Sequence, residues 1–239
     1  MMKLNDDIKN DIEELQYKSI ITFPKNENYI RKEFKPLVSY EGFYSFFKDN
    51  ILTKRINTTK TKNLRATFYG CVNLSKITFL NEIDTRNVIT FEALFSGDKK
   101  LENFDGIENW ITNKCINFAD CFYGTGLSTL KYFKNWEFKN NCNCRGMFMY
   151  SQINSLEGLN EMKFIDVKNG NFMFAYTQIT DLKGSEGFDL SKFNTVQNMF
   201  KGCKKLKDIS VFKTWKHYNE YNPKIIFNEC PLIDSSQLN

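Results

Sequence analysis

The sequence predicts an α/β repeat solenoid in which about seven units of 26–27 residues stack side by side. The main observation is a ladder of phenylalanines, and two further apolar positions recur at fixed distances from it. Seven phenylalanines follow one another at separations of 27, 27, 26, 26, 26 and 27 residues: Phe68, Phe95, Phe122, Phe148, Phe174, Phe200 and Phe227. One unit of this length is too short to bury its own apolar face, so we expect neighbouring units to share one continuous core.

The residues around these phenylalanines repeat with them. An aliphatic residue follows most rings after five or six positions, and a second apolar residue follows three positions later, as in Leu74 and Ile77. Glycine stands two positions after four of the rings: Gly70, Gly97, Gly124 and Gly202. A second aromatic residue follows 14–16 positions after five of the rings: Trp110, Trp136, Phe164, Phe188 and Trp215. Because each copy places these side chains alike, we expect them to form the core rather than a ligand site.

The Leu-x-x-Leu segment of each unit predicts a short strand, and successive strands are expected to pair as a parallel sheet. Side chains alternate across a strand, so the residues directly before and after the second aliphatic position should point outward together. These residues form a polar stripe of mixed charge, which is the predicted partner-binding surface. The stripe comprises Lys76, Thr78, Asn103, Asp105, Thr129, Lys131, Ser155, Glu157, Asp181, Lys183, Asp208 and Ser210. A solvated sheet face is also polar, so this composition fits either a binding site or an ordinary surface.

The chain carries 33 Lys and Arg against 28 Asp and Glu, a formal net charge of +5. Its basic residues gather in two clusters that could meet an acidic partner. The clusters are Lys54, Arg55, Lys60, Lys62 and Arg65, and Lys201, Lys204, Lys205 and Lys207. A dedicated nucleic-acid binder shows a stronger basic bias and a recognisable motif, so we favour solvated surface lysines over nucleic-acid binding.

The chain offers little material for metal binding or catalysis. Its seven cysteines contain no CxxC pair, and His217 is its single histidine. Zinc sites need paired thiolates, or thiolates with imidazoles, at repeatable spacing, so no metal site is predicted. The sequence contains no glycine-rich phosphate loop, no GxSxG and no recognisable frame of paired carboxylates. It therefore predicts a protein that is not an enzyme and needs no cofactor, with its thiols free and mostly buried.

Three regions are predicted along the chain. Residues 1–61 are expected to form a partly helical N-terminal cap, residues 62–235 the repeat solenoid, and residues 236–239 a tail. A cap is needed because a solenoid otherwise leaves a solvent-exposed apolar face at its end.

Local patterns describe both ends in more detail. Asn5 can cap a helix whose one-sided apolar stripe is Ile8, Ile12 and Leu15. The aromatic-rich segment 29–47 is expected to cover the first unit, although an exposed aromatic cluster would instead be a contact surface. An insertion with two tyrosines at residues 218–223 either caps the last unit or binds a partner.

One run of the sequence, Val-Gln-Asn-Met-Phe-Lys-Gly-Cys-Lys-Lys-Leu at residues 196–206, has a specific likeness. It resembles the hallmark of the BspA-like leucine-rich repeat family, in the form common in surface proteins of mollicutes and other low-GC bacteria. Residues 84–88, Asp-Thr-Arg-Asn-Val, look like the family's link between copies, and the three tryptophans look like its tryptophan. The copies depart from the motif where Cys is usual: Asp98, Thr125, Ser151 and Thr177.

The resemblance covers roughly residues 62–235 and has implications for fold and function. It implies a leucine-rich-repeat-like architecture, a role in adhesion or protein binding, and no catalytic residues.

No stretch of 18 uncharged apolar residues occurs, so no transmembrane helix is predicted. Residues 1–7 lack the apolar core of a signal peptide, which predicts a cytoplasmic location unless an export segment was removed.

The preferred function is a non-catalytic scaffold that binds a partner protein inside the cell, as an inhibitor, a phage-type counter-defence protein or an effector. The first alternative is a bacterial cell-surface adhesin, which the resemblance implies. The second is a nucleic-acid or ribonucleoprotein binder that uses the lysine clusters.

Overall fold

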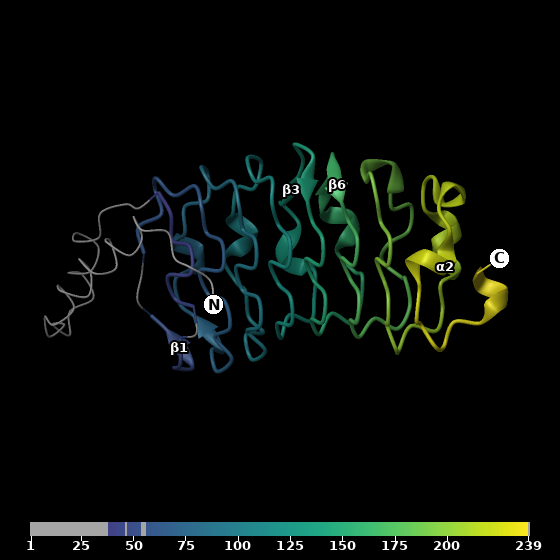
Figure 1. Ribbon diagram of the computed structural model, residues 1–239, viewed down its shortest axis with the longest axis horizontal. Coiled ribbons are helices and arrows are strands. Elements are labelled where there is room, and N and C mark those ends of the chain that lie inside the picture. The colour runs from purple at the N-terminus through teal and green to yellow at the C-terminus, as the bar shows by residue number, and fades with distance from the viewer. Residues whose placement is uncertain (1–37, 46, 54–55, 239) are drawn as a thin grey trace, which may run out of the picture.

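The computed structural model in Figure 1 describes residues 38–45, 47–53 and 56–238. Within these residues, successive segments wind into coils that lie side by side along the long axis of the molecule (Figure 1). The coils follow sequence order, from the purple coil that contains β1 to the yellow coil that contains α2. The predicted helix with Asn5, Ile8, Ile12 and Leu15 lies outside the described residues.

The regular elements are short, and most of each coil consists of turns. The described strands are β1 (Ile51–Leu52), β2 (Lys76–Ile77), β3 (Glu137–Phe138), β4 (Cys142–Asn143), β5 (Lys163–Phe164) and β6 (Val167–Asn169). The described helices are α2 (Pro223–Ile226) and the 3-10 helices η1 (Leu80–Glu82), η2 (Ile107–Asn109), η3 (Lys131–Phe133), η4 (Leu159–Glu161), η5 (Leu190–Lys192), η6 (Ser210–Thr214), η7 (Tyr218–Glu220) and η8 (Ser235–Leu238). The strands pair in parallel, β1 with β2, β3 with β5 and β4 with β6. No helix in the described part of the chain has the length and apolar character that a membrane span requires.

A continuous column of stacked aromatic rings runs through the coils. It begins at Tyr44 and continues through the seven phenylalanines of the ladder, and all eight side chains are buried. Neighbouring rings lie 5.2–5.8 Å apart between centroids, with interplanar angles of 5–28°. Aromatic pairs contribute about 0.5–1.5 kcal/mol each beyond the burial of their area, so the column stabilises every junction between coils.

The backbone of the ring-bearing segments forms a regular ladder between coils. In the segment around Phe95, the N–H groups of Phe91, Ala93, Phe95 and Gly97 donate to carbonyls of the next coil at 2.8–2.9 Å. The N–H groups between them fold back, and Leu94 donates to the carbonyl of Phe91. This alternation depends on left-handed residues two positions before and two after the ring, here Ala93 (φ 53°) and Gly97 (φ 89°). The ladder is therefore built from turns rather than from extended strands.

The Leu-x-x-Leu segments pair less than the sequence predicts. β2 lies in the first of these segments, and Asp181 forms a parallel bridge with Asp208. The other Leu-x-x-Leu segments of the described chain contain no strand or bridge. In most copies a side chain of the stripe instead accepts the N–H two residues later, as Asn103 Oδ1 does from the Asp105 N–H (2.7 Å) in an unpaired copy. The two bridged residues, Asp181 and Asp208, make the same local turn (3.0 and 2.9 Å), so the turn accompanies both paired and unpaired copies.

The three tryptophans add hydrogen bonds between coils. The buried indole N–H of Trp110 donates to the carbonyl of Leu80 at 2.8 Å, and that of Trp136 donates to the carbonyl of Ile107 at 2.9 Å. The indole of Trp215 donates to Ser185 Oγ at 3.0 Å. A buried indole needs such an acceptor, so these bonds position each tryptophan against the coil before it.

The first described coil starts before the boundary predicted at residue 62. The N–H groups of Tyr40 and Tyr44 donate to the carbonyls of Asn63 and Thr67, which is the pairing seen in the later ring-bearing segments. Tyr44 takes the place of the phenylalanine and lies 5.6 Å from Phe68. Part of the predicted cap thus continues the aromatic column.

In the last described coils, side chains of the C-terminal segment bond the backbone of earlier coils. Gln237 in η8 accepts from the Ile209 N–H at 3.0 Å and donates to the Lys207 carbonyl at 3.1 Å. In the insertion at residues 218–223, the Tyr221 hydroxyl donates to the Leu190 carbonyl at 3.1 Å. Both contacts hold the C-terminal segment against the coils before it.

Candidate protein-binding surface

The twelve residues of the predicted stripe all lie outside the core. Ten of them are exposed, and Thr129 and Asp181 are half-buried. Hydrogen bonds from Ser210, with a smaller attraction from Lys183, hold the pKa of Asp208 below its usual range. This places the charged groups of the last two copies near one another, while the described contacts join no larger set of stripe residues.

The first stripe residue of most copies serves the local turn. Each of these side chains accepts a hydrogen bond, of 2.7–3.3 Å, from the N–H of the residue two positions later. They are Asn103, Thr129, Ser155, Asp181 and Asp208. Asn, Asp, Ser and Thr are the residues that form such side-chain turns. Their polarity is therefore needed by the fold, and recognition through the stripe would rest on the residues that follow them.

The lysine clusters are partly neutralised by carboxylates. Arg65 pairs with Glu41 at 2.8 Å and with Glu92 at 3.2 Å. Lys201 pairs with Glu229 at 2.9 Å. The remaining described members are exposed: Lys60, Lys62, Lys204, Lys205 and Lys207. Lys54 and Arg55 lie outside the described residues.

A row of tyrosines crosses the coils directly after the stacked rings. Tyr69 and Tyr123 occupy the position after the ring, and Tyr150 and Tyr176 occupy the next position. The Tyr123 and Tyr150 centroids lie 5.3 Å apart edge to face, and those of Tyr150 and Tyr176 lie 4.6 Å apart with an interplanar angle of 4°. Tyr150 is 43% exposed. We call these four residues the tyrosine row.

Two members of the tyrosine row have an unusual backbone. Tyr150 has φ 60° and Tyr176 has φ 58°, both in the left-handed region. Glycine occupies the same position in four other coils and adopts this conformation without strain. A bulky residue there costs about 1–3 kcal/mol, and such strain is concentrated at functional sites. Two adjacent coils thus present stacked tyrosines on a backbone that favours glycine.

The hydroxyls of Tyr123 and Tyr176 remain hydrogen-bond donors at neutral pH. Partial burial, with Tyr150 nearby, raises the pKa of Tyr123. Desolvation, with Glu229 nearby, raises the pKa of Tyr176, whose hydroxyl donates to Glu229 at 3.4 Å. The row therefore combines apolar ring surface with polar tips, which is typical of protein interfaces.

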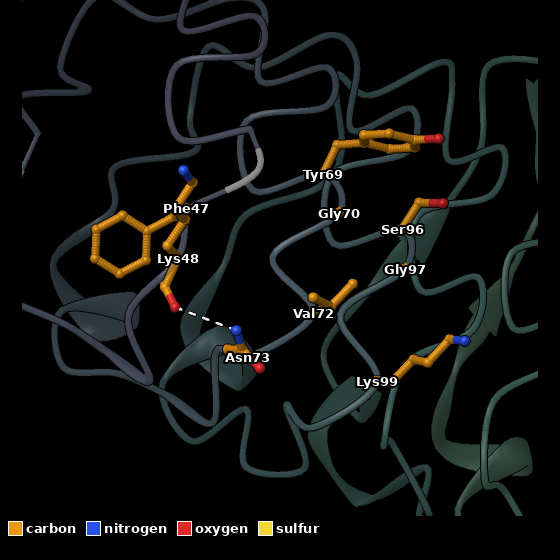
Figure 2. Close-up of a pocket in the computed structure, with 9 residues that line it drawn as sticks. All are labelled: Phe47, Lys48, Tyr69, Gly70, Val72, Asn73, Ser96, Gly97 and Lys99. Atoms are coloured by element: carbon orange, nitrogen blue, oxygen red, sulfur yellow. Dashed lines mark hydrogen bonds between the residues drawn. The ribbon is translucent and has the colours of Figure 1, made fainter.

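A hollow of about 360 Å³ lies at the end of the row that contains Tyr69 (Figure 2). Its lining consists of Phe47, Lys48, Tyr69, Gly70, Val72, Asn73, Ser96, Gly97 and Lys99. Gly70 and Gly97 are adjacent in space, because a Cβ on Gly97 would lie 3.5 Å from the Gly70 Cα. Figure 2 shows the Phe47 ring and Lys48 on one side of the hollow, and Val72, Lys99 and Tyr69 toward the other side. An Asn73 amide donates to the Lys48 carbonyl at 3.4 Å across its edge.

Asp98 lies beneath this surface, with its side chain turned into the core. It is 0% exposed, and its Oδ1 accepts from the Cys71 N–H at 2.7 Å, while no described group bonds its Oδ2. Burial raises its pKa to about 9, although the Cys71 N–H acts in the opposite direction. At neutral pH the carboxyl is therefore protonated and contributes no charge to the hollow above it.

Most of the described thiols are buried in the core. Cys142 and Cys144 lie 3.7 Å apart between sulfur atoms and are buried. Burial raises the pKa of Cys115, Cys121 and Cys144, which keeps these thiols protonated and unreactive. Among the described residues, no group of three or more His, Cys, Asp or Glu could hold a metal ion.

Two overlapping stretches of the chain, residues 39–162 and 128–237, match the family model described as "Mycoplasma protein of unknown function, DUF285". The chain belongs to this family. No curated protein and no solved structure matches it. The matches to DUF285 span the coils and overlap, as expected when one model fits repeated units in more than one position. Membership of DUF285 is also consistent with the resemblance to repeat proteins of mollicutes.

Sequence reasoning missed the tyrosine row of this DUF285 chain, although a signal was present. The recurring glycine two positions after the ring is replaced by Tyr150 and Tyr176 in two adjacent copies. A large residue at a position that favours glycine indicates either that the backbone there avoids the left-handed region or that a functional surface requires the side chain. The hollow was also missed, because it depends on which coils keep their glycine.

Proposed function

We propose that this DUF285 protein is a leucine-rich-repeat-type solenoid of the BspA-like kind, and that it binds a partner protein without catalysis. The tyrosine row is its binding surface. One observation carries the proposal: Tyr150 and Tyr176 stack 4.6 Å apart on left-handed backbone, where four other coils have glycine. The chain keeps strained aromatic residues at its surface, and partner binding supplies a reason for that strain.

The composition of the surface supports a protein partner. The row and the adjoining hollow contain Tyr, Gly, Ser and Asn, which are enriched in antibody combining sites, together with Phe47, Val72 and two lysines. Tyrosine is also enriched among residues that dominate binding energy, because it offers a large rigid contact area and a hydroxyl. The stacked rings and the backbone ladder beneath hold these side chains on a fixed framework.

The solenoid part of the proposal rests on the coils themselves. Parallel bridges join residues one repeat apart, at Asn63, Thr90, Asn117 and Asn143. The aromatic column contains one ring from each successive coil. Side-by-side coils of this kind give a long surface on which several neighbouring copies can contact one partner.

Replacing Tyr150 and Tyr176 together by glycine is expected to weaken partner binding by at least about ten-fold, since interface tyrosines contribute more than about 1 kcal/mol each. Folding stability is expected to change by less than about 1 kcal/mol, because relief of left-handed strain offsets the lost stacking. Affinity capture from the source cells with the full chain as bait identifies the partner. Calorimetric titration of that purified partner then compares the wild type with the variant.

A stripe variant provides the matched control. Charge reversal at Lys131, Glu157 and Lys183 changes three exposed stripe residues and leaves the tyrosine row intact. We expect this variant to retain the partner. Loss of the partner with the stripe variant, together with full binding by the tyrosine variant, would move the site to the stripe and contradict the proposal. Protease digestion of intact cells distinguishes an intracellular binder from a cell-surface adhesin.

A further inference from the structure

The surface that carries the tyrosine row differs between its early and its middle coils. Two positions after the ring, the early coils have Gly70 and Gly97, whereas later coils have Tyr150 and Tyr176. Gly70 has φ 71° and Gly97 has φ 89°, so residues with side chains are disfavoured at both positions, and neither position contributes a side chain to the hollow above them. Tyr69 belongs both to the row and to the lining of the hollow. The hollow is therefore a recess in the same surface.

The walls of the hollow are largely apolar and its rim is cationic. Phe47 is half-buried and Val72 is 52% exposed, which is a high exposure for an aliphatic side chain. Lys48 and Lys99 are exposed and contribute to the lining. A third cation, Lys100, donates from Nζ to Asn73 Oδ1 at 3.3 Å, at the edge of the hollow. An apolar recess with several lysines around it favours an apolar group accompanied by negative charge.

The described residues that line the hollow include no carboxylate to oppose these cations. Asp98 precedes Lys99 in the chain, but its side chain points into the core and is protonated at neutral pH, because burial raises its pKa to about 9. Asp49 follows Lys48 and is exposed outside the lining. The rim of the hollow is therefore positively charged.

We propose that this hollow takes an acidic peptide segment of the partner protein, with one apolar side chain between Phe47 and Val72 and carboxylates against Lys48 and Lys99. This inference rests on the proposed protein-binding function. The volume of about 360 Å³ is near the lower limit of ligand sites, which suits one or two side chains of a peptide better than a large cofactor. Carboxylates at the rim steer the segment into place, and burial of its apolar side chain supplies most of the affinity.

A peptide selection tests the proposal without knowledge of the partner. A phage-displayed library of random peptides is selected on the immobilised full chain. We expect enriched sequences to combine Asp or Glu with an aromatic or aliphatic residue. Fluorescence anisotropy then compares an enriched peptide with a version in which each Asp and Glu is replaced by Asn or Gln, and the neutral version is expected to bind at least about ten-fold more weakly.

Variants of the chain locate the binding site. Lys48→Glu combined with Lys99→Glu is expected to weaken the enriched peptide by about ten-fold or more. The matched control, Lys204→Glu combined with Lys205→Glu, reverses two exposed lysines in a distant coil and is expected to bind within about two-fold of the wild type, because it leaves the hollow unchanged. Thermal melting verifies that both variants fold.

Three outcomes would overturn the inference. The first is enrichment of peptides without acidic residues, and the second is unchanged binding by the Lys48 and Lys99 variant. The third is tighter binding of a single-stranded oligonucleotide than of the acidic peptide, which would indicate a nucleic-acid site. The experiments distinguish failure of this inference from failure of the proposed function. A partner that binds the Lys48 and Lys99 variant normally but binds the tyrosine variant weakly would contradict only the inference about the hollow.

Discussion

Replacing Asp98 by Asn is expected to remove most of the pH dependence of folding stability between about pH 5 and pH 9. The folded-state pKa of Asp98, about 9, lies above the unfolded-state value, which is about 3.9 for a free aspartate. The folded chain therefore holds a proton that the unfolded chain releases. This stabilisation is complete below the unfolded-state pKa and is lost as the pH rises toward 9, at up to about 1.4 kcal/mol per pH unit. The wild-type melting temperature should fall by about 5–10 °C between about pH 6 and pH 8.

The asparagine variant keeps the geometry and loses the titration. Its Oδ1 can accept from the Cys71 N–H as the carboxyl does, and its amide NH2 takes the place of the protonated Oδ2. Thr125 and Thr177 show that this position accommodates a donor, because their hydroxyls donate to ring-residue carbonyls at 2.9 and 2.8 Å. The control is Glu161→Gln, which makes the same chemical change at an exposed residue. Parallel melting-temperature profiles for the wild type and the Asp98→Asn variant would show that the folded chain does not retain this proton.

Truncation of Phe122 to alanine is expected to destabilise the fold by about 3–5 kcal/mol. The ring is fully buried and stacks on both sides, 5.4 Å from Phe95 and 5.8 Å from Phe148, so neighbouring coils cannot close the cavity without losing their own contacts. For a chain of this size the loss corresponds to about 6–20 °C in melting temperature, measured by calorimetry or circular dichroism.

The same truncation at Phe227 provides the comparison for Phe122, because the two rings differ in their position along the column. Phe227 stacks on Phe200 and is the last ring of the column in the described part of the chain. Terminal units of a repeat array have only one neighbour and can open locally, so Phe227→Ala should cost less than Phe122→Ala. Equal losses at both positions would mean that the coils are not stabilised by contacts with their nearest neighbours.

The aromatic framework is the feature that the sequence describes best. Equal spacing of one bulky residue type is a long-range signal, and the seven phenylalanines lie in one column in the structure. The sequence also predicts that the tryptophans are core residues, because Trp110 and Trp136 stand at nearly equal distances in the chain after the phenylalanines of their units. The continuation of the column to Tyr44 was not predicted, since a shorter spacing and a different residue type conceal it.

The backbone pairing could not be predicted from the same pattern. Alternation of apolar and polar residues indicates an extended strand, whereas the ring-bearing segments pair through alternating turns with left-handed residues such as Ala93. Alanine has no sequence signature for that conformation. By contrast, the Asn, Thr, Ser and Asp residues at the first stripe position did carry a signal for side-chain turns, which a reading based on exposure alone overlooks.

The candidate site depends on differences between copies rather than on the repeat. Tyr150 and Gly97 occupy the same position of their units, yet one builds a raised aromatic contact and the other a recess. Only the arrangement of coils shows that these positions share one surface, through backbone bonds such as that from the Gly97 N–H to the Tyr123 carbonyl.

The aromatic column also fixes the distance between features of the surface along the array. Each coil advances the array by one ring spacing of 5.2–5.8 Å, so the separation between the recess at Gly97 and the stacked pair at Tyr150 is counted in whole coils. Duplication or loss of one unit between them would lengthen or shorten that separation by one step and leave each element intact. Under the proposed function, a change in the number of coils would fit such chains to partners of different dimensions.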